Sequence, residues 1–280
     1  MESRGHAYTA PARLIAGTLV AASRAGLLAV LVGAVAADDP VSPFTLARGL
    51  VTFAAVPALA SWLLGRVSAV RISVAAGALV FARRDWHVEI PCAAVAGVVP
   101  WTLPPPAPGF SLQMRSGSPF PYGIASSAAV PLLRALLEVG QVDAARAALT
   151  HPTLLYAEAR RTVAGRRWWA PLGKFVAFAL LPTALVFNAD QHITFGGTLG
   201  QYYLEGLGPY LRRFAMYWAL AVIYLLLYAA VWRALAEGVA FLAARIAPSQ
   251  AATVRSAVEI GCRLVYYVGI PVIVLMPFLR

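Results

Sequence analysis

Two residues that could exchange a proton lie two positions apart in a polar segment of the chain. Asp190 and His192 combine a carboxylate with an imidazole, which suits acid–base chemistry or half of a metal site. A catalytic zinc site usually has three protein ligands, and the other three histidines fall in segments expected on the opposite side of a membrane. We therefore expect an ordered loop at 189–210, including Glu205, that packs on the bilayer or docks a partner. Catalysis or metal binding is the alternative.

A single arginine interrupts the first long apolar stretch, 14–37. Arg24 lies about 15 Å along a helix from the start of this stretch, near the middle of a bilayer. A central arginine costs at least about 2.5 kcal/mol. One interpretation is a tilted or half-inserted helix from which Arg24 reaches the headgroups. The other is an arginine that faces the bundle or a partner subunit and binds a lipid headgroup or a carboxylate, since no acid lies at matching depth in the other expected spans.

Basic and aromatic residues cluster before one of the later apolar stretches. Arginines beside interfacial tryptophans suit anionic lipid headgroups, and each charge near the surface contributes about 1 kcal/mol. The alternative is that these arginines only set the topology. The candidates for lipid or partner binding here are Arg160, Arg161, Arg166, Arg167, Trp168 and Trp169.

Three tyrosines recur at helical spacing along the stretch 214–236. Tyr217, Tyr224 and Tyr228 form a stripe that usually serves packing, and a groove for a lipophilic ligand is the alternative. The sequence has no nucleophile elbow, HExxH motif or Walker A motif, and Ser23, Ser61 and Ser68 lack a plausible base. We therefore predict no enzyme activity, no cofactor and no metal.

The composition indicates whether water or lipid surrounds these residues. The chain has 280 residues, of which 60% are hydrophobic and only 12% are charged, and its mean hydropathy is +0.71. Soluble domains carry about 25% charged residues, so this chain has too little polar surface to be coated by water. Lipid is the simplest alternative, and we predict an α-helical membrane protein with about five spans. Their expected ranges are 14–37, 44–67, 170–188, 214–236 and 258–278.

The net charge of +11 sets the expected orientation. Most of the 23 lysines and arginines fall on one side if the N-terminus is cytoplasmic, so the positive-inside rule puts the C-terminus outside. Lys174 is the only lysine, and this arginine bias, together with many alanines, is typical of bacteria with GC-rich genomes. We expect a multi-pass protein of a bacterial inner membrane. Its basic surface should contact anionic lipids, and no nucleic acid is expected.

The stretch between the second and third expected spans has a different residue pattern from the spans. Short alternating runs at 69–74, 79–83, 86–90, 94–99, 110–115 and 120–124 read as strands, and a leucine-rich helix follows. Four short motifs support a resemblance to a known family: Gly-Ala-Leu-Val (77–80), Glu-Ile-Pro (89–91), Pro-Gly-Phe-Ser-Leu-Gln (108–113) and Arg-Ser-Gly (115–117). With the closing helix, residues 70–139 resemble bacterial pleckstrin-homology-like (PH-like) domains joined to membrane helices. The resemblance implies a small β-barrel or split sheet at the membrane surface and no catalytic residues.

These observations predict four regions and a non-enzymatic role. The regions are an N-terminal membrane hairpin (1–67), a PH-like cytoplasmic domain (68–140), a helical linker (141–168) and a three-helix membrane region (169–280) that holds the periplasmic loop. We expect an assembly, scaffolding or accessory subunit that binds another membrane protein. The alternatives are a protein that binds or moves a lipid or amphiphile, and an intramembrane enzyme using Asp190 and His192.

Overall fold

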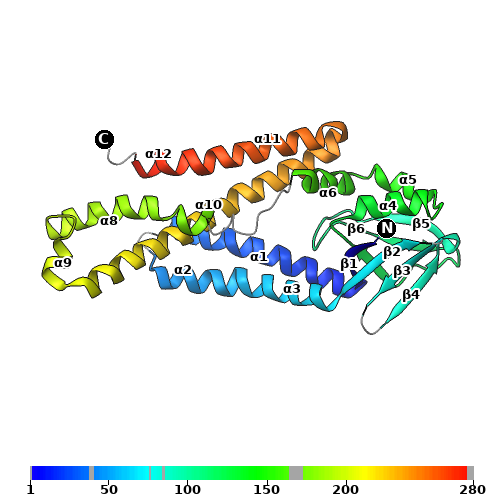
Figure 1. Ribbon diagram of the computed structural model, residues 1–280, viewed down its shortest axis with the longest axis horizontal. Coiled ribbons are helices and arrows are strands. Elements are labelled where there is room, and N and C mark those ends of the chain that lie inside the picture. The colour runs from blue at the N-terminus through cyan, green and yellow to red at the C-terminus, as the bar shows by residue number, and fades with distance from the viewer. Residues whose placement is uncertain (1, 38–40, 76, 84–85, 164–172, 276–280) are drawn as a thin grey trace. The chain divides into compact units, whose positions relative to one another are not determined.

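The computed structural model describes residues 2–37, 41–75, 77–83, 86–163 and 173–275 (Figure 1). Residue contacts divide the chain into two units. The first comprises Met1–Arg24, Ala54–Ala164 and Ala236–Glu259. The second comprises Ala25–Phe53, Gly165–Leu235 and Ile260–Arg280. The first unit contains the β domain together with helix segments that pack on it, and the second contains helical segments only.

The β domain is a curled, antiparallel half-barrel of seven strands in the order β4-β3-β2-β1-β7-β6-β5. Expected strands match β2 to β7, because alternating apolar residues in these runs point into one core that contains Ile72, Phe81, Leu112 and Ile124. The strands are β1 (Glu2–Thr9), β2 (Ala69–Ala75), β3 (Ala78–Ala82), β4 (His87–Pro91), β5 (Val95–Pro100), β6 (Gly109–Met114) and β7 (Tyr122–Ala125).

The central strand β1 lies outside the predicted domain and corrects its boundary. Residues 2–9 were assigned to the N-terminal hairpin, but they pair with β2 from Glu2↔Ser73 to His6↔Ala69 and with β7 from His6↔Ala125 to Thr9↔Tyr122. The next two long helices follow β1 and precede β2. The membrane hairpin is therefore inserted between the first two strands of the β domain, whereas we had expected the β domain to be inserted between membrane helices.

Three helices close the open side of the sheet. The expected leucine-rich helix is α4 (Ala129–Glu138), whose Leu132, Leu133 and Leu136 are fully buried in the core of the β domain. The stretch expected as a helical linker forms α5 (Ala144–Leu149) and α6 (Pro152–Val163), and Ala145, Ala148 and Leu154 of these helices are buried in the same core, so they belong to the β domain. A short 3₁₀ turn, η2 (Cys92–Ala94), joins the two edge strands β4 and β5.

Among the described residues, four helical stretches are long and apolar enough to cross a membrane: Ala10–Ala36, Pro43–Val67, Gly173–Phe195 and Leu207–Ile246. They match the first four expected spans. The fifth expected span, 258–278, falls on α11 (Ala251–Leu264), the π-helical segment η5 (Val265–Gly269) and α12 (Ile270–Leu275), and its end lies outside the described residues. The length and composition of these four helices suit a chain that crosses a membrane several times.

The segment 189–210 is helical, which corrects the predicted loop. Helix α8 (Leu180–Phe195) ends at Gly196, which has a left-handed backbone with φ of 76°. Helix α9 (Gly200–Glu205) and the 40-residue α10 (Leu207–Ile246) follow after short turns. Glycines permit these tight connections, so the polar composition marks two helix ends and not an extended loop.

Each of the three π-helical segments lies shortly before a proline inside an apolar helix. These segments are η1 (Val51–Ala55) between α2 (Pro43–Leu50) and α3 (Val56–Val67), η3 (Gly173–Ala177), and η5. The prolines Pro57, Pro182 and Pro271 cannot donate to the preceding turn, which disturbs the regular ladder of hydrogen bonds.

Side chains of other helices supply hydrogen bonds to these π-helical segments. The Ser23 hydroxyl donates to the Ala54 carbonyl at 2.8 Å, and the Tyr228 hydroxyl donates to the Val265 carbonyl at 3.2 Å. The Tyr266 hydroxyl donates to the Lys174 carbonyl at 2.8 Å. Because unpaired carbonyls are costly in lipid, these bonds fix where helices touch. Gly26 adds to the hairpin contact, since a Cβ there would collide with the Phe53 carbonyl.

A disulfide can test the position of β1. Glu2 lies directly opposite Ser73, and the same row continues to Val80 and Glu89 on β3 and β4. With Cys92 and Cys262 replaced by alanine, we expect Glu2→Cys/Ser73→Cys to form a disulfide on mild oxidation, read by mass spectrometry of linked peptides. The matched pair Glu2→Cys/Glu89→Cys spans about 14 Å and should stay reduced. Equal linkage of both pairs would contradict the strand order.

Candidate functional site

The junction between the β domain and the first hairpin has no linker. β1 ends at Thr9 and α1 (Ala10–Ala36) begins at the next residue, while only Ser68 separates α3 from β2. The two helices are neighbours here, because the Ser61 hydroxyl donates to the Ala16 carbonyl at 3.2 Å. The paired strands thus continue directly into the paired helices.

A proline-rich loop of the β domain covers the first turns of α1. Ala16 is fully buried in a cluster with Tyr8, Trp101 and Ala125. A Cβ on Gly17 would lie 3.5 Å from the Pro105 carbonyl, so a small residue allows the loop to approach the helix. The loop therefore covers only the beginning of α1. The remainder of the helix, about 20 residues, matches the length that a bilayer requires.

Aromatic and basic side chains surround this junction. The Arg13 guanidinium lies over the Trp101 ring at 4.7 Å, and Arg66 lies over Trp62 at 4.8 Å. The Trp101 indole donates to the Ser111 hydroxyl at 3.0 Å, which fixes the ring. Tryptophan and arginine at helix ends are typical of the boundary between lipid and water.

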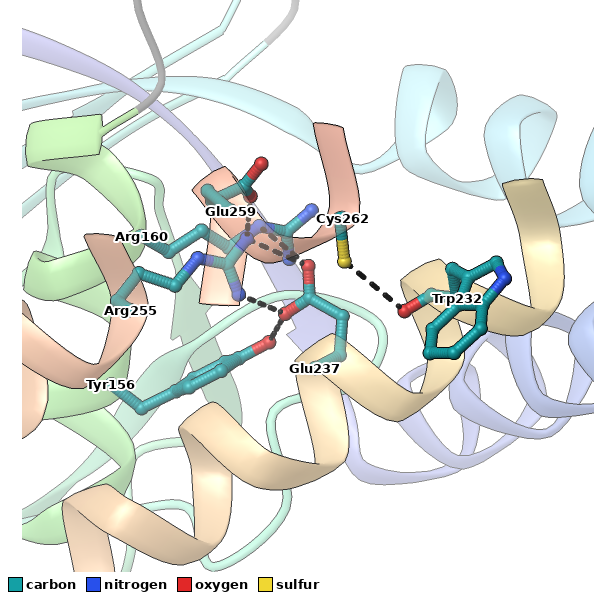
Figure 2. A network of polar contacts seen from close by, with 7 residues as sticks. All are labelled: Tyr156, Arg160, Trp232, Glu237, Arg255, Glu259 and Cys262. Carbon is teal, nitrogen blue, oxygen red and sulfur yellow. Dashed lines mark hydrogen bonds and ion pairs between the residues drawn. The ribbon is translucent and has the colours of Figure 1, made fainter. Parts of the chain in front are cut away.

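A second group of polar side chains joins α6, α10 and α11 within the first unit (Figure 2). Glu237 on α10 accepts two hydrogen bonds from Arg255 on α11, from Nη1 at 2.9 Å and from Nη2 at 3.0 Å. Arg255 Nη2 also donates to Glu259 at 2.7 Å. Tyr156 on α6 donates its hydroxyl proton to Glu237, and Arg160 lies 4.0 Å from the same carboxylate. We call these five residues the charge cluster.

The centre of the charge cluster is largely buried, and its two arginines balance its two glutamates. The Arg255 side chain is 2% exposed and that of Glu237 is 13% exposed. Burial lowers the pKa of Arg255, but hydrogen bonding and attraction from Glu237 and attraction from Glu259 outweigh it, so the pKa is raised. Burial and the bond to Glu237 raise the pKa of Tyr156, which keeps the phenol protonated as a donor. Arg255 and Tyr156 therefore both stay protonated, which suits a structural joint.

The structure separates Asp190 from His192. The Asp190 carboxylate pairs with Arg213 of α10 at 2.8 Å, and its other oxygen is buried without a hydrogen-bond partner. The exposed His192 ring bonds the Asn188 carbonyl at 2.9 Å. Glu205 accepts a 2.7 Å hydrogen bond from Gln201. The Asp190–Arg213 pair joins α8 to α10, whereas the other two contacts lie within α8 and within α9, and the three contacts do not form the acid–base pair of the catalytic alternative.

Arg24 is exposed on α1, where only Ala16 and Gly26 are buried. It is the 15th residue of this 27-residue helix. Across the parts of the chain that the structure describes, its side chain makes no ion pair or hydrogen bond. The residues beside it that contact the second helix are Ser23, at Ala54, and Gly26, at Phe53. Arg24 therefore faces away from the hairpin.

The two arginines on α6 that were candidates for lipid binding pair with acids. Arg160 lies near Glu237, and Arg161 lies 3.4 Å from Glu158 one turn earlier. Both arginines are about half exposed, so these pairs contribute little energy. The remaining candidates of this group, Arg166, Arg167, Trp168 and Trp169, lie outside the described residues.

The three tyrosines of the predicted stripe have different surroundings. Tyr217 packs beside Phe187 of α8, with ring centroids 6.0 Å apart, whereas Tyr228 bonds Val265 of η5. Tyr224 is 39% exposed. Two of the three thus serve packing between helices, which supports the ordinary interpretation, and they do not line one groove.

Sequence reasoning missed the charge cluster because its members come from distant segments. Tyr156 and Glu237 are 81 positions apart, and Glu237 and Arg255 are 18 apart. One signal was available. Glu237 and Arg255 lie on either side of Ala-Pro-Ser-Gln (247–250), where the Pro248 turn η4 (Pro248–Gln250) folds α11 back along α10. A helical hairpin at this turn brings the two residues to similar height.

The charge cluster predicts strong coupling between Glu237 and Arg255. Arg255→Met should leave the Glu237 carboxylate without its main partner and lower the free energy of unfolding by about 3–5 kcal/mol. The double variant Glu237→Leu/Arg255→Met should lose much less, because no unpaired charge remains. Thermal unfolding in detergent, followed by tryptophan fluorescence, measures both. Additive losses in the double variant would show that the two residues act independently.

A second prediction concerns His151, which precedes α6. Its Nδ1 accepts the backbone N–H of Thr153 at 3.3 Å, and burial followed by Arg245 lowers its pKa below the usual 6.5. The folded chain thus favours neutral His151, so this contribution to stability is complete above pH 6.5 and is lost as the pH falls from 6.5 through the lower pKa of the folded state.

We expect the melting temperature of the wild type to fall more steeply between pH 7.5 and 5.5 than that of His151→Asn. Asparagine retains a capping acceptor worth about 1 kcal/mol but does not titrate. Parallel curves for the two proteins would remove His151 as the cause.

Among the described residues, no group of three or more histidine, cysteine, aspartate or glutamate side chains is placed to hold a metal ion. No family model, no curated protein and no solved structure matches the chain. The PH-like resemblance therefore stays a prediction. The geometry establishes a half-barrel built onto membrane-type helices, with one buried charge cluster and one exposed arginine in the middle of α1.

Proposed function

We propose that the protein is a non-enzymatic subunit of a membrane complex, which assembles with another membrane protein through the first hairpin. The observation that carries this proposal is Arg24. A guanidinium near the middle of an apolar helix costs at least about 2.5 kcal/mol in lipid, and Arg24 has no partner among the described residues. A carboxylate on a helix of a second protein would remove that cost and give a charge-assisted hydrogen bond.

The surroundings of Arg24 fit a helix contact. Gly33 is the one glycine of α1 whose position is open, since a Cβ there would meet nothing within 4 Å. Large apolar residues on α1, including Leu28, Val32 and Val35, are exposed within the chain. Small residues let helices approach closely, and apolar side chains then pack against the partner. The scaffold for this contact is firm, because the hairpin continues into the sheet without a linker.

The proposal includes a bacterial inner membrane with the β domain in the cytoplasm. Arg13 and Arg66 lie at the ends of α1 and α3 that adjoin the sheet, whereas Asp38 and Asp39 occupy the sequence between the hairpin helices. The positive-inside rule then puts the sheet on the cytoplasmic side. Neither alternative function gains support, because the tyrosine stripe is divided between two contacts and Asp190 pairs with Arg213 instead of His192.

Purification of the tagged protein in mild detergent, with mass spectrometry of bound proteins and lipids together, tests the role of Arg24. We expect one stoichiometric membrane protein with the wild type, at least a tenfold loss of it with Arg24→Leu, and partial recovery with Arg24→Lys. The matched control is Arg48→Leu, an exposed arginine of the second helix close to its end, from where it can reach the headgroups.

Retention of the partner by Arg24→Leu would show that Arg24 is not the contact. A protein that purifies alone with one enriched lipid, lost in Arg24→Leu, would replace the subunit proposal by lipid binding. Loss of the partner in both Arg24→Leu and Arg48→Leu would indicate a general effect of charge.

A further inference from the structure

A hollow on the outer face of the β domain is lined by basic side chains. Arg4 on β1, Arg71 on β2 and Arg83 after β3 line it, together with Gly5, His6 and Ser127. The two strands here are central in the sheet, and their inward residues, such as Ile72, fill the core. The arginines therefore project from the opposite, solvent-accessible face.

Arg4 and Arg71 occupy directly opposite positions of the β1–β2 ladder. Directly opposed residues of an antiparallel pair have Cβ atoms about 5 Å apart, and like charges in this relation destabilise the sheet. An anion between the two guanidinium groups would convert this repulsion into two charge-assisted contacts.

Glu2 is the acid among the described lining residues, and it neutralises the hollow only weakly. Glu2 lies 3.9 Å from Arg71, but the two side chains are 65% and 72% exposed, so this pair is weak. Arg83 has an interaction of its own and is not needed for the argument. Ser126 and Ser127 bring the beginning of the ten-residue helix α4 to the rim, where backbone N–H groups add to the positive potential.

The hollow lies close to the membrane end of the first unit. His6, on its wall, bonds the Gly65 carbonyl near the end of α3 at 2.8 Å. Ala107, also on the wall, belongs to the proline-rich loop that covers α1. Arg71 is four residues beyond Val67, or about 13 Å along an extended chain, and a long arginine side chain extends over part of that distance.

We propose that Arg4 and Arg71 bind the phosphate group of an anionic lipid headgroup. Guanidinium groups match phosphate oxygens in pairs, and the site lies beside helices that end at the membrane surface. Its ligand holds the outer face of the sheet toward the bilayer. The proposal does not depend on Arg24 or on a protein partner, since the two sites use different residues on different elements.

Native mass spectrometry of the full-length protein in neutral detergent, titrated with phosphatidylglycerol, measures this binding. We expect Arg4→Gln/Arg71→Gln to bind the first lipid at least tenfold more weakly than the wild type. Arg134→Gln/Arg146→Gln removes the same charge from exposed positions on α4 and α5 and should bind like the wild type. Arg4→Lys/Arg71→Lys should retain part of the affinity.

Two further measurements are needed. One distinguishes a lipid headgroup from free phosphate, and the other distinguishes a lost binding site from a destabilised variant. Inorganic phosphate, compared with chloride at equal ionic strength, should raise the melting temperature much less than phosphatidylglycerol does. Equal stabilisation by inorganic phosphate would overturn the lipid assignment. In detergent without anions of this kind, Arg4→Gln/Arg71→Gln should be at least as stable as the wild type, because the repulsion is removed. A less stable variant, or equal lipid binding by both glutamine variants, would overturn the site.

Discussion

The antiparallel pairing of β1 with β2 is the constraint on which the arrangement of the first unit depends. Both strands are continuous with membrane-type helices, so the register that pairs Gly5 with Val70 also fixes where α1 meets α3. Sheet hydrogen bonds outside the lipid and the Ser61–Ala16 contact between helices act on the same two chain segments. A shift in the strand register would therefore move the helix contact, and a shift in the helix contact would move the strands. The sheet is thus a rigid base for the hairpin.

A second connection joins the β domain to the end of α10 and the beginning of α11. Arg245 and Thr153 both donate to the Thr102 carbonyl at the start of the proline-rich loop, at 3.3 and 3.2 Å. The charge cluster holds α6 between these helices and this loop. Such buried ion pairs add little net stability relative to apolar packing, but they tolerate few alternative arrangements. Their contribution here is to specify which helix faces meet.

The predictability of each element follows from how local its determinants are. Strands β2 to β7 and the apolar helices could be predicted, because alternation and long apolar runs are local patterns. Strand β1 could not, since Glu-Ser-Arg-Gly-His-Ala-Tyr-Thr has little β-branched character and is a strand only through pairing on both sides. The polar segment after Asn188 was misassigned because glycines at helix ends resemble a loop in composition. Arg24 stands out in the sequence as a charge within an apolar run and its role stays a prediction, whereas the charge cluster requires tertiary contacts that no local pattern encodes.

Placing a membrane hairpin between the first two strands has a consequence for biosynthesis. β1 is translated before both hairpin helices, yet its partners β2 and β7 are made only after them. If the hairpin crosses a membrane, the sheet can close only after both helices have inserted and returned the chain to its starting side. A nascent chain with one helix inserted would leave β1 across the bilayer from the rest of its sheet, with an exposed core that quality-control proteases can recognise. Completion of the half-barrel thus reports correct insertion of the hairpin.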